Sequence, residues 1–159
     1  MSNFERELVR SFNESFSEHG IDAVAYRMKQ HRFSQQMLDI LVDSQDRRFY
    51  LGIECKSISP SKGLSALYFS QHFTVDKKGE HQVEKMHGFI KQSGRQGFLA
   101  VELRMGSGKS KAAHFVPWHE VWRRYNAGQP GFPIQELKLI NPITRIDGRY
   151  AVETLFGPR

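Results

Sequence analysis

The stretch Leu51-Gly-Ile-Glu-Cys-Lys56 decides how this chain folds. It is an apolar run typical of a β-strand, and it ends in an acid and a base two positions apart. Alternate residues of a strand point to the same face, so Glu54 and Lys56 are expected to lie side by side, with Cys55 on the opposite face. An ordinary edge-strand ion pair is the simplest interpretation. A carboxylate and an ammonium fixed on one strand can also hold a divalent metal and a charge-stabilising cation against a phosphate.

The segment that precedes this stretch predicts an antiparallel hairpin between residues 37–43 and residues 47–56. If Asp46 and Arg47 form a two-residue turn, Asp39 lies directly opposite Glu54, with the two Cβ atoms about 5 Å apart. A register slip of one residue would separate these two acids. The other face of the hairpin is then apolar and carries Leu38, Ile40, Val42, Phe49, Leu51, Ile53 and Cys55.

Residues 3–18 predict an amphipathic helix that ends at Gly20. Its apolar residues recur every four positions and are Phe4, Leu8, Phe12 and Phe16. Glu5 falls inside this apolar stripe, whereas Arg6 falls outside it. A carboxylate that points toward a core needs a partner or a proton, which makes Glu5 a candidate functional residue.

Further elements are expected along the rest of the chain, among them a second helix at 80–93 from which Gln82 is expected to point inward. They are a strand at 21–27, a helix at 80–93, a buried strand at 97–103 with a partner at 111–116, a helix that starts at Pro117 and a hairpin at Asp147-Gly148. Strands that alternate with helices predict an α/β fold. We expect one domain over residues 1–159, with a core at 1–126 and a C-terminal extension at 127–159 that packs on it.

Composition narrows the class of protein. A length of 159 residues with 39% hydrophobic residues suits one α/β domain. The single cysteine excludes an intramolecular disulfide, and no apolar stretch approaches the length of about 20 residues that a membrane span needs. We therefore expect a cytoplasmic protein without membrane association. The net charge of +6 favours an anionic partner such as nucleic acid. The Gly106-Ser-Gly-Lys-Ser110 segment lacks the first glycine of a phosphate loop, so no nucleotide cofactor is expected.

Residues 28–36 form a basic segment, because no acid occurs between Asp22 and Asp39. A mobile basic loop beside an active site and a merely solvated loop fit this composition equally well. Candidate DNA contacts in this segment and beyond it are Lys29, Arg32, Ser34 and Lys62.

The three acids Glu5, Asp39 and Glu54 are expected to converge. Carboxylates at close range repel one another, and a hard cation such as Mg²⁺, with Mn²⁺ as a substitute, compensates for this repulsion through oxygen ligands. The backbone carbonyl of Cys55 is a further candidate ligand. Lys56 can orient the attacking water or neutralise charge on a phosphate. Gln82 either holds Lys56 or the water in place, or simply bonds to the backbone.

At these residues the chain resembles the PD-(D/E)xK nuclease superfamily and, more narrowly, the archaeal-type Holliday junction resolvases. The motifs that carry the resemblance are Phe4-Glu-Arg-Glu-Leu8, Asp39-Ile-Leu-Val42, Tyr50-Leu-Gly-Ile-Glu-Cys-Lys56 and the passage from Phe89 to Leu103. The segments Glu80–His87 and Pro117–Trp122 are also similar to RecU-type resolvases. The resemblance covers residues 3–126.

The resemblance implies a restriction-endonuclease-like fold, with a mixed central sheet flanked by helices. It also implies a homodimer that makes paired, metal-dependent cuts across a four-way DNA junction. Glu5, Asp39 and Glu54 would be metal ligands, Lys56 the catalytic base or charge stabiliser, and Arg6 and Arg27 contacts to the DNA backbone. The chain departs from the pattern where Met37 and Leu38 replace the proline of the motif and where residues 57–75 form a longer segment. A nuclease of the restriction or repair type on duplex DNA and a non-catalytic DNA-binding module are the alternatives.

Overall fold

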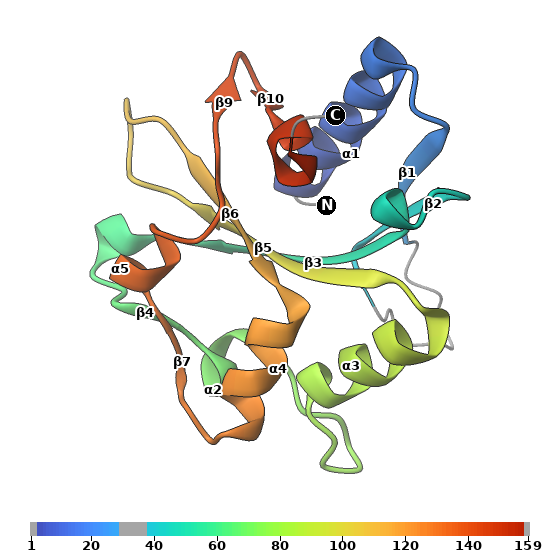
Figure 1. Cartoon of the computed structure of the whole chain (residues 1–159). Coiled ribbons are helices and arrows are strands. Elements are labelled where there is room, and N and C mark those ends of the chain that lie inside the picture. Colours follow the sequence, from blue (N-terminus) through green and yellow to red (C-terminus); the bar gives the residue numbers. More distant parts are fainter. Residues whose placement is uncertain (1–2, 29–37, 158–159) are drawn as a thin grey trace.

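The computed structural model describes residues 3–28 and 38–157. Its centre is a six-stranded sheet with the strand order β1-β2-β3-β5-β6-β8 (Figure 1). The strands are β1 Ala23–Arg27, β2 Ile40–Ser44, β3 Leu51–Ile58, β5 Gln96–Leu103, β6 Ala112–Pro117 and β8 Pro142–Ile143. Strands β3 and β5 pair in parallel, whereas the other neighbouring strands pair antiparallel. The sheet is therefore mixed, as predicted.

Helices cover both faces of this sheet (Figure 1). Helix α1 (Asn3–His19) lies on one face, and α3 (Gln82–Ser93) and α4 (Trp118–Asn126) lie on the other. Along β5, Leu99 packs into the apolar cluster beneath α3 and α4, whereas Ala100 packs into the cluster beneath α1. A strand buried on both faces needs an almost continuous apolar run. The predicted fold class, a mixed central sheet flanked by helices, is confirmed.

Short elements fill the connections around the main sheet. They are η1 Arg47–Phe49, η2 Pro60–Lys62, β4 Ala66–Tyr68, α2 Phe69–His72, β7 Gly131–Pro133, α5 Ile134–Leu137, β9 Arg145–Ile146, β10 Arg149–Tyr150 and η3 Val152–Phe156. Strands β4 and β7 form a small separate sheet, as do β9 and β10. Segment 57–75, which has no clear sequence period, thus folds into two strand pieces joined by short helical turns.

Strands β2 and β3 pair in the predicted register, but their connection is longer than predicted. The paired residues are Ile40–Ile53, Leu41–Gly52 and Val42–Leu51. In this register Asp39 is opposite Glu54. The predicted two-residue turn is wrong, because residues 45–50 connect the strands and include the 3-10 helix η1. Asp46 caps this helix by accepting the Arg48 N–H, which stabilises a tight helical turn at this point.

Leu38 lies on the opposite face of the sheet from the one predicted. It packs in the cluster beneath α3 and α4, whereas Ile40 packs beneath α1. Strand β2 begins only at Ile40, so the alternation of a strand does not extend back to Leu38. A Cβ added to Gly52 would lie 2.5 Å from Leu38 Cδ1. Leu38 therefore occupies the space that the missing side chain of Gly52 leaves.

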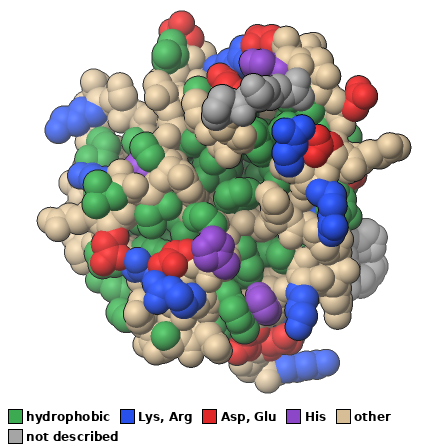
Figure 2. Space-filling model, viewed as in Figure 1, with side chains coloured by type: hydrophobic (Ala, Val, Ile, Leu, Met, Phe, Trp, Pro, Cys, Tyr) green, Lys and Arg blue, Asp and Glu red, His purple; other side chains and the backbone are tan. Residues whose placement is uncertain are grey.

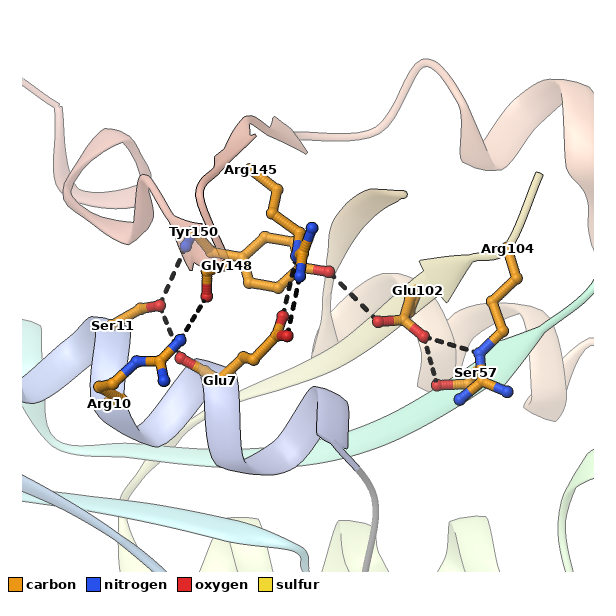
Figure 3. A network of polar contacts seen from close by, with 9 residues as sticks. All are labelled: Glu7, Arg10, Ser11, Ser57, Glu102, Arg104, Arg145, Gly148 and Tyr150. Atoms are coloured by element: carbon orange, nitrogen blue, oxygen red, sulfur yellow. Dashed lines mark hydrogen bonds and ion pairs between the residues drawn. The ribbon is translucent and has the colours of Figure 1, made fainter. Parts of the chain in front are cut away.

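The C-terminal hairpin β9–β10 packs against α1. Its turn residues Asp147 and Gly148 have φ of 52° and 76°, as a type I′ turn requires. The Arg145 guanidinium donates two hydrogen bonds of 2.9 Å to the Glu7 carboxylate on α1 (Figure 3). Tyr150 is completely buried. This hairpin was predicted from the Asp-Gly pair, and its contacts hold the start of α1 on the sheet.

The surface on the side drawn in Figure 1 has an apolar centre. Figure 2 shows hydrophobic side chains in the middle of this face and charged side chains mostly toward its rim. Within residues 3–28 and 38–157, no helix is long and apolar enough to cross a membrane.

Candidate active site

The candidate active site lies where β2 and β3 separate. The ladder between these strands ends at Ile40 and Ile53, and Asp39 comes directly before it. The Asp39 backbone N–H donates to Ile53 O at 3.1 Å. The Asp39 side chain turns toward β3, where its Oδ2 accepts a 2.8 Å hydrogen bond from the Cys55 backbone N–H. This contact fixes the carboxylate beside the strand that carries Glu54.

Glu54 is an acid in an environment that opposes its charge. Its residue is only 4% exposed. Burial raises the pKa of the Glu54 carboxyl well above its usual range, and the negative charge of Asp39 raises this pKa further. The nearby Lys56 lowers the pKa of Glu54 but does not cancel the two larger effects. A bound proton or an additional cation relieves such a pair of acids.

Lys56 and Gln82 both approach the same oxygen of Glu54. The Lys56 Nζ lies 3.4 Å from Glu54 Oε2. Gln82, the first residue of α3, donates from its side-chain amide to this oxygen at 2.8 Å. The amide oxygen of Gln82 accepts the Thr74 backbone N–H at 3.1 Å. Gln82 therefore bonds to the backbone, one of the two alternatives considered from the sequence, and its contact at the site is to Glu54, which was not predicted.

Glu5 points inward from the first turn of α1, as predicted, and forms an ion pair there. Its Oε2 accepts hydrogen bonds of 2.7 and 3.1 Å from the guanidinium of Arg27 on β1. The side chain of Glu5 is 14% exposed. Arg27, expected to contact DNA, thus supplies the partner that an inward carboxylate needs.

Cys55 follows Glu54 on β3, and its backbone N–H bonds to the Asp39 carboxylate. Burial raises the pKa of the Cys55 thiol well above its usual range, and the negative charges of Asp39, Glu54 and Glu5 raise this pKa further. The side chain of Cys55 packs against the cluster beneath α1, as the alternation of β3 predicts. The role of its backbone carbonyl as a metal ligand stays a prediction.

The donor set suits a hard cation. Asp39 and Glu54 offer carboxylate oxygens, and Mg²⁺ is typically held by one or two carboxylates together with the phosphates of a substrate. Among the residues that the structure describes, no group of three or more His, Cys, Asp or Glu side chains is arranged to hold a metal ion. Glu5, whose oxygen is bonded to Arg27, is close to the pair but is not assembled with it. The fit therefore rests on the buried Glu54 and the half-buried Asp39 beside it.

The predicted DNA contacts are distributed over several segments. Arg6 on α1 and Lys62 on η2 are exposed. Arg27 is half-buried against Glu5. Lys29, Arg32 and Ser34 lie outside the described residues. The contact of these residues with DNA stays a prediction.

The sequence interpretation missed Phe73. The Lys56 ammonium lies over the Phe73 ring, 4.6 Å from its centroid. Phe73 belongs to segment 57–75, which was noted from the sequence only as longer than the resolvase pattern. Nothing in that segment indicated a contact with Lys56.

Comparisons with known proteins identify the fold. No family model matches this chain. No curated protein matches it either. Among solved structures, the chain is similar to Hjc, a Holliday junction resolvase from the archaeal hyperthermophile Archaeoglobus fulgidus. The TM-score is 0.50 and the sequence identity 21%, over 88% of this chain and 93% of that chain. At this identity the similarity concerns the arrangement of helices and strands.

Proposed function

We propose that this protein is a metal-dependent endodeoxyribonuclease that resolves four-way DNA junctions. The observation that carries the proposal is the buried Glu54 beside the half-buried Asp39, with Lys56 and Gln82 on one oxygen of Glu54. Acids whose pKa values are shifted by burial and by a like charge cluster at functional sites. The resolvase-like arrangement of the sheet and helices supports the choice of substrate.

Asp39 and Glu54 would hold Mg²⁺, with Mn²⁺ as a substitute, and the Cys55 carbonyl and Glu5 complete the proposed ligand set. When bound, the cation polarises the phosphodiester and lowers the pKa of the attacking water. A doubly charged ion also removes the electrostatic cost that burial places on Glu54.

The remaining residues of the site act on position and charge. The Lys56 ammonium, beside Glu54, would stabilise the negative charge that develops on the phosphate. In the alternative role of base, Lys56 would have to be a neutral amine before it takes the proton of the attacking water. Gln82 fixes the Glu54 carboxylate by its 2.8 Å hydrogen bond, so the acid keeps one orientation through the reaction.

DNA affinity should come mainly from phosphate contacts. The net charge of +6 and the exposed Arg6 and Lys62 support binding that weakens steeply with salt. Selectivity would come from the shape of the junction and not from base edges.

A two-fold symmetric dimer is the assembly that we propose. Two related nicks in a symmetric junction need two copies of one site, and a dimer supplies them through one repeated surface. The face in Figure 2, with apolar side chains at the centre and charged ones toward the rim, has the distribution common at protein interfaces. Sedimentation equilibrium tests the dimer, and a monomer at all protein concentrations would contradict it.

The decisive experiment is a cleavage assay with a four-way junction and its component duplexes, with and without Mg²⁺. Wild type is compared with Asp39→Asn and with Asp22→Asn, a control that removes the charge of an exposed acid outside the site. We expect paired nicks in the junction by wild type and the control, only with Mg²⁺, and none by Asp39→Asn.

Cleavage of the duplexes at the same rate would instead support a nuclease of the restriction or repair type. Binding in Ca²⁺ without nicks in Mg²⁺ or Mn²⁺ would support a non-catalytic DNA-binding module. Full activity of Asp39→Asn would show that the site is elsewhere.

A further inference from the structure

Lys56 is held from two sides. On one side its Nζ lies 3.4 Å from Glu54 Oε2, which is longer than the 2.7–2.9 Å typical of charged hydrogen bonds. That oxygen already accepts the shorter bond from Gln82. On the other side the Lys56 ammonium lies 4.6 Å from the centroid of the Phe73 ring. A cation over an aromatic face is attracted by the ring quadrupole, so this contact holds the ammonium where Glu54 alone does not.

Phe73 is itself fixed in place. It is 4% exposed, and its ring packs 5.8 Å from that of Phe69 and 6.0 Å from that of His81. The Nδ1 of His81 accepts the Val83 backbone N–H, which caps α3. Since Nδ1 is an acceptor, Nε2 carries the proton and donates to Phe69 O at 2.9 Å. The histidine therefore ties the aromatic pair to the start of α3.

The same segment fixes the second partner of Glu54. Thr74 follows Phe73 directly, and its backbone N–H donates to the side-chain oxygen of Gln82. The Thr74 carbonyl accepts the Gln82 backbone N–H at 2.8 Å. Both groups that touch Glu54 Oε2 are thus oriented by consecutive residues, Lys56 by Phe73 and Gln82 by Thr74.

We propose that Phe73 is a positioning residue of the active site and that its aromatic face sets the place of the Lys56 ammonium. The proposal rests on the proposed function insofar as Lys56 acts on the phosphate. It goes beyond that function by assigning a role to segment 57–75, the part of the chain that departs from the resolvase pattern. The interaction is electrostatic, so it depends on the charge distribution of the ring and not only on its volume.

Two changes at position 73 separate the ring electrostatics from packing. Phe73→Leu keeps an apolar side chain and removes the ring, whereas 3,4,5-trifluorophenylalanine keeps the shape of the ring and weakens its negative face. We expect each to lower kcat for junction cleavage by about 5- to 30-fold, with KM and DNA binding in Ca²⁺ unchanged.

Phe132→Leu is the matched control. Phe132 is completely buried in the same apolar cluster, and its ring carries the guanidinium of Arg124 at 4.4 Å from the centroid. This variant therefore loses the same volume and the same type of interaction, but its ring carries Arg124 in place of Lys56 and is connected to Phe73 through Phe69. We expect its kcat to stay near that of wild type.

A second readout needs no activity. In wild type the ε-methylene protons of Lys56, assigned through their loss in Lys56→Arg, should show an upfield ring-current shift in NMR spectra. Phe73→Leu should abolish this shift and Phe132→Leu should leave it unchanged. If wild type cuts no DNA, the proposed function fails, and this shift alone decides the placement of Lys56. A wild-type kcat with trifluorophenylalanine, or a Lys56 shift unaffected by Phe73→Leu, would overturn the proposal.

Discussion

Two groups of acids lie on opposite faces of the central sheet, and their neighbours differ. On one face Asp39 and Glu54 are next to each other and have Lys56 and Gln82 as partners. On the other face, Glu7 and Glu102 each have an arginine, Arg145 for Glu7 and Arg104 for Glu102 (Figure 3). We call these the site pair and the arginine-paired network.

The arginine-paired network is satisfied within the protein. Glu102 is 1% exposed, and it also accepts hydrogen bonds from the hydroxyls of Ser57 and Tyr150. The hydrogen bond from Arg145 holds the pKa of Glu7 below its usual range, whereas the pKa of Glu54 is raised. Burial of an acid is therefore not by itself a sign of function. The sign is a buried acid whose neighbours do not balance its charge.

The largest expected contrast is in activity. Glu54→Gln should lower the rate of junction cleavage by roughly 100-fold or more, because it removes a proposed metal ligand. Glu102→Gln should leave the rate close to that of wild type, since Glu102 faces away from the site. Single-turnover cleavage in Mg²⁺ measures both. Equal losses would mean that the two groups of acids do not differ in function.

Stability should respond in the opposite order. Glu102→Gln should lower the free energy of unfolding by about 1–3 kcal/mol, because buried partners lose a charged acceptor. Glu54→Gln should not lower it, since the variant removes a charge that burial and Asp39 disfavour. Urea unfolding in the presence of EDTA measures this, with Glu80→Gln as an exposed control. A less stable Glu54→Gln would place Glu54 with the structural acids.

Glu5 is intermediate between the two groups, because it is paired with Arg27 yet close to the site. Arg27→Gln should lower the free energy of unfolding by about 1 kcal/mol, since both side chains are partly exposed. It should also raise the affinity for Mg²⁺, because it removes a competing cation and releases the Glu5 carboxylate. Isothermal titration calorimetry measures this affinity. An unchanged affinity would assign Glu5 to structure alone.

The smallest effect is the dependence of metal-free stability on pH, which has opposite signs in the two groups. The pKa of Glu54 is higher in the folded protein than in the unfolded chain. The contribution of Glu54 to the free energy of unfolding is therefore fully present below the ordinary glutamate pKa of about 4.5, and it is lost as pH rises through the pKa of the folded protein. The pKa of Glu7 is lowered in the folded protein. The contribution of Glu7 to the free energy of unfolding is therefore fully present above a pH of about 4.5, and it is lost as pH falls through the pKa of the folded protein.

Urea unfolding on both sides of about pH 4.5 tests these signs. Glu54→Gln should remove a loss of stability toward neutral pH, and Glu7→Gln should remove a loss toward acid pH. Identical pH profiles of the two variants would contradict the assignment.

The site pair could be predicted from the sequence because local patterns determine it. The apolar alternation of β2 and β3 fixes which residues face each other, and this places Asp39 beside Glu54 even though the connecting turn was wrong. The inward position of Glu5 followed from the period of α1. Leu38 was misplaced because the alternation ends where the strand ends.

The partners of these residues could not be predicted in the same way. Arg145 bonds to Glu7 across 138 positions of the chain, and charged side chains on separate elements carry no pattern that pairs them. Phe73 follows a stretch without a period, so its contact with Lys56 depends on how that segment folds back. Sequence periodicity reports which face a residue takes, whereas its partner on that face depends on tertiary packing.

The missing side chain of Gly52 affects the packing beside the site. Gly52 is two positions before Glu54 and carries no side chain, and the methyl group of Leu38 fills that hollow. A methyl group at position 52 would lie 2.5 Å from Leu38 Cδ1, so the Leu38 side chain would have to move aside. Leu38 is the residue directly before Asp39 and is completely buried. A glycine on β3 therefore makes room for the side chain that anchors the residue next to a site carboxylate.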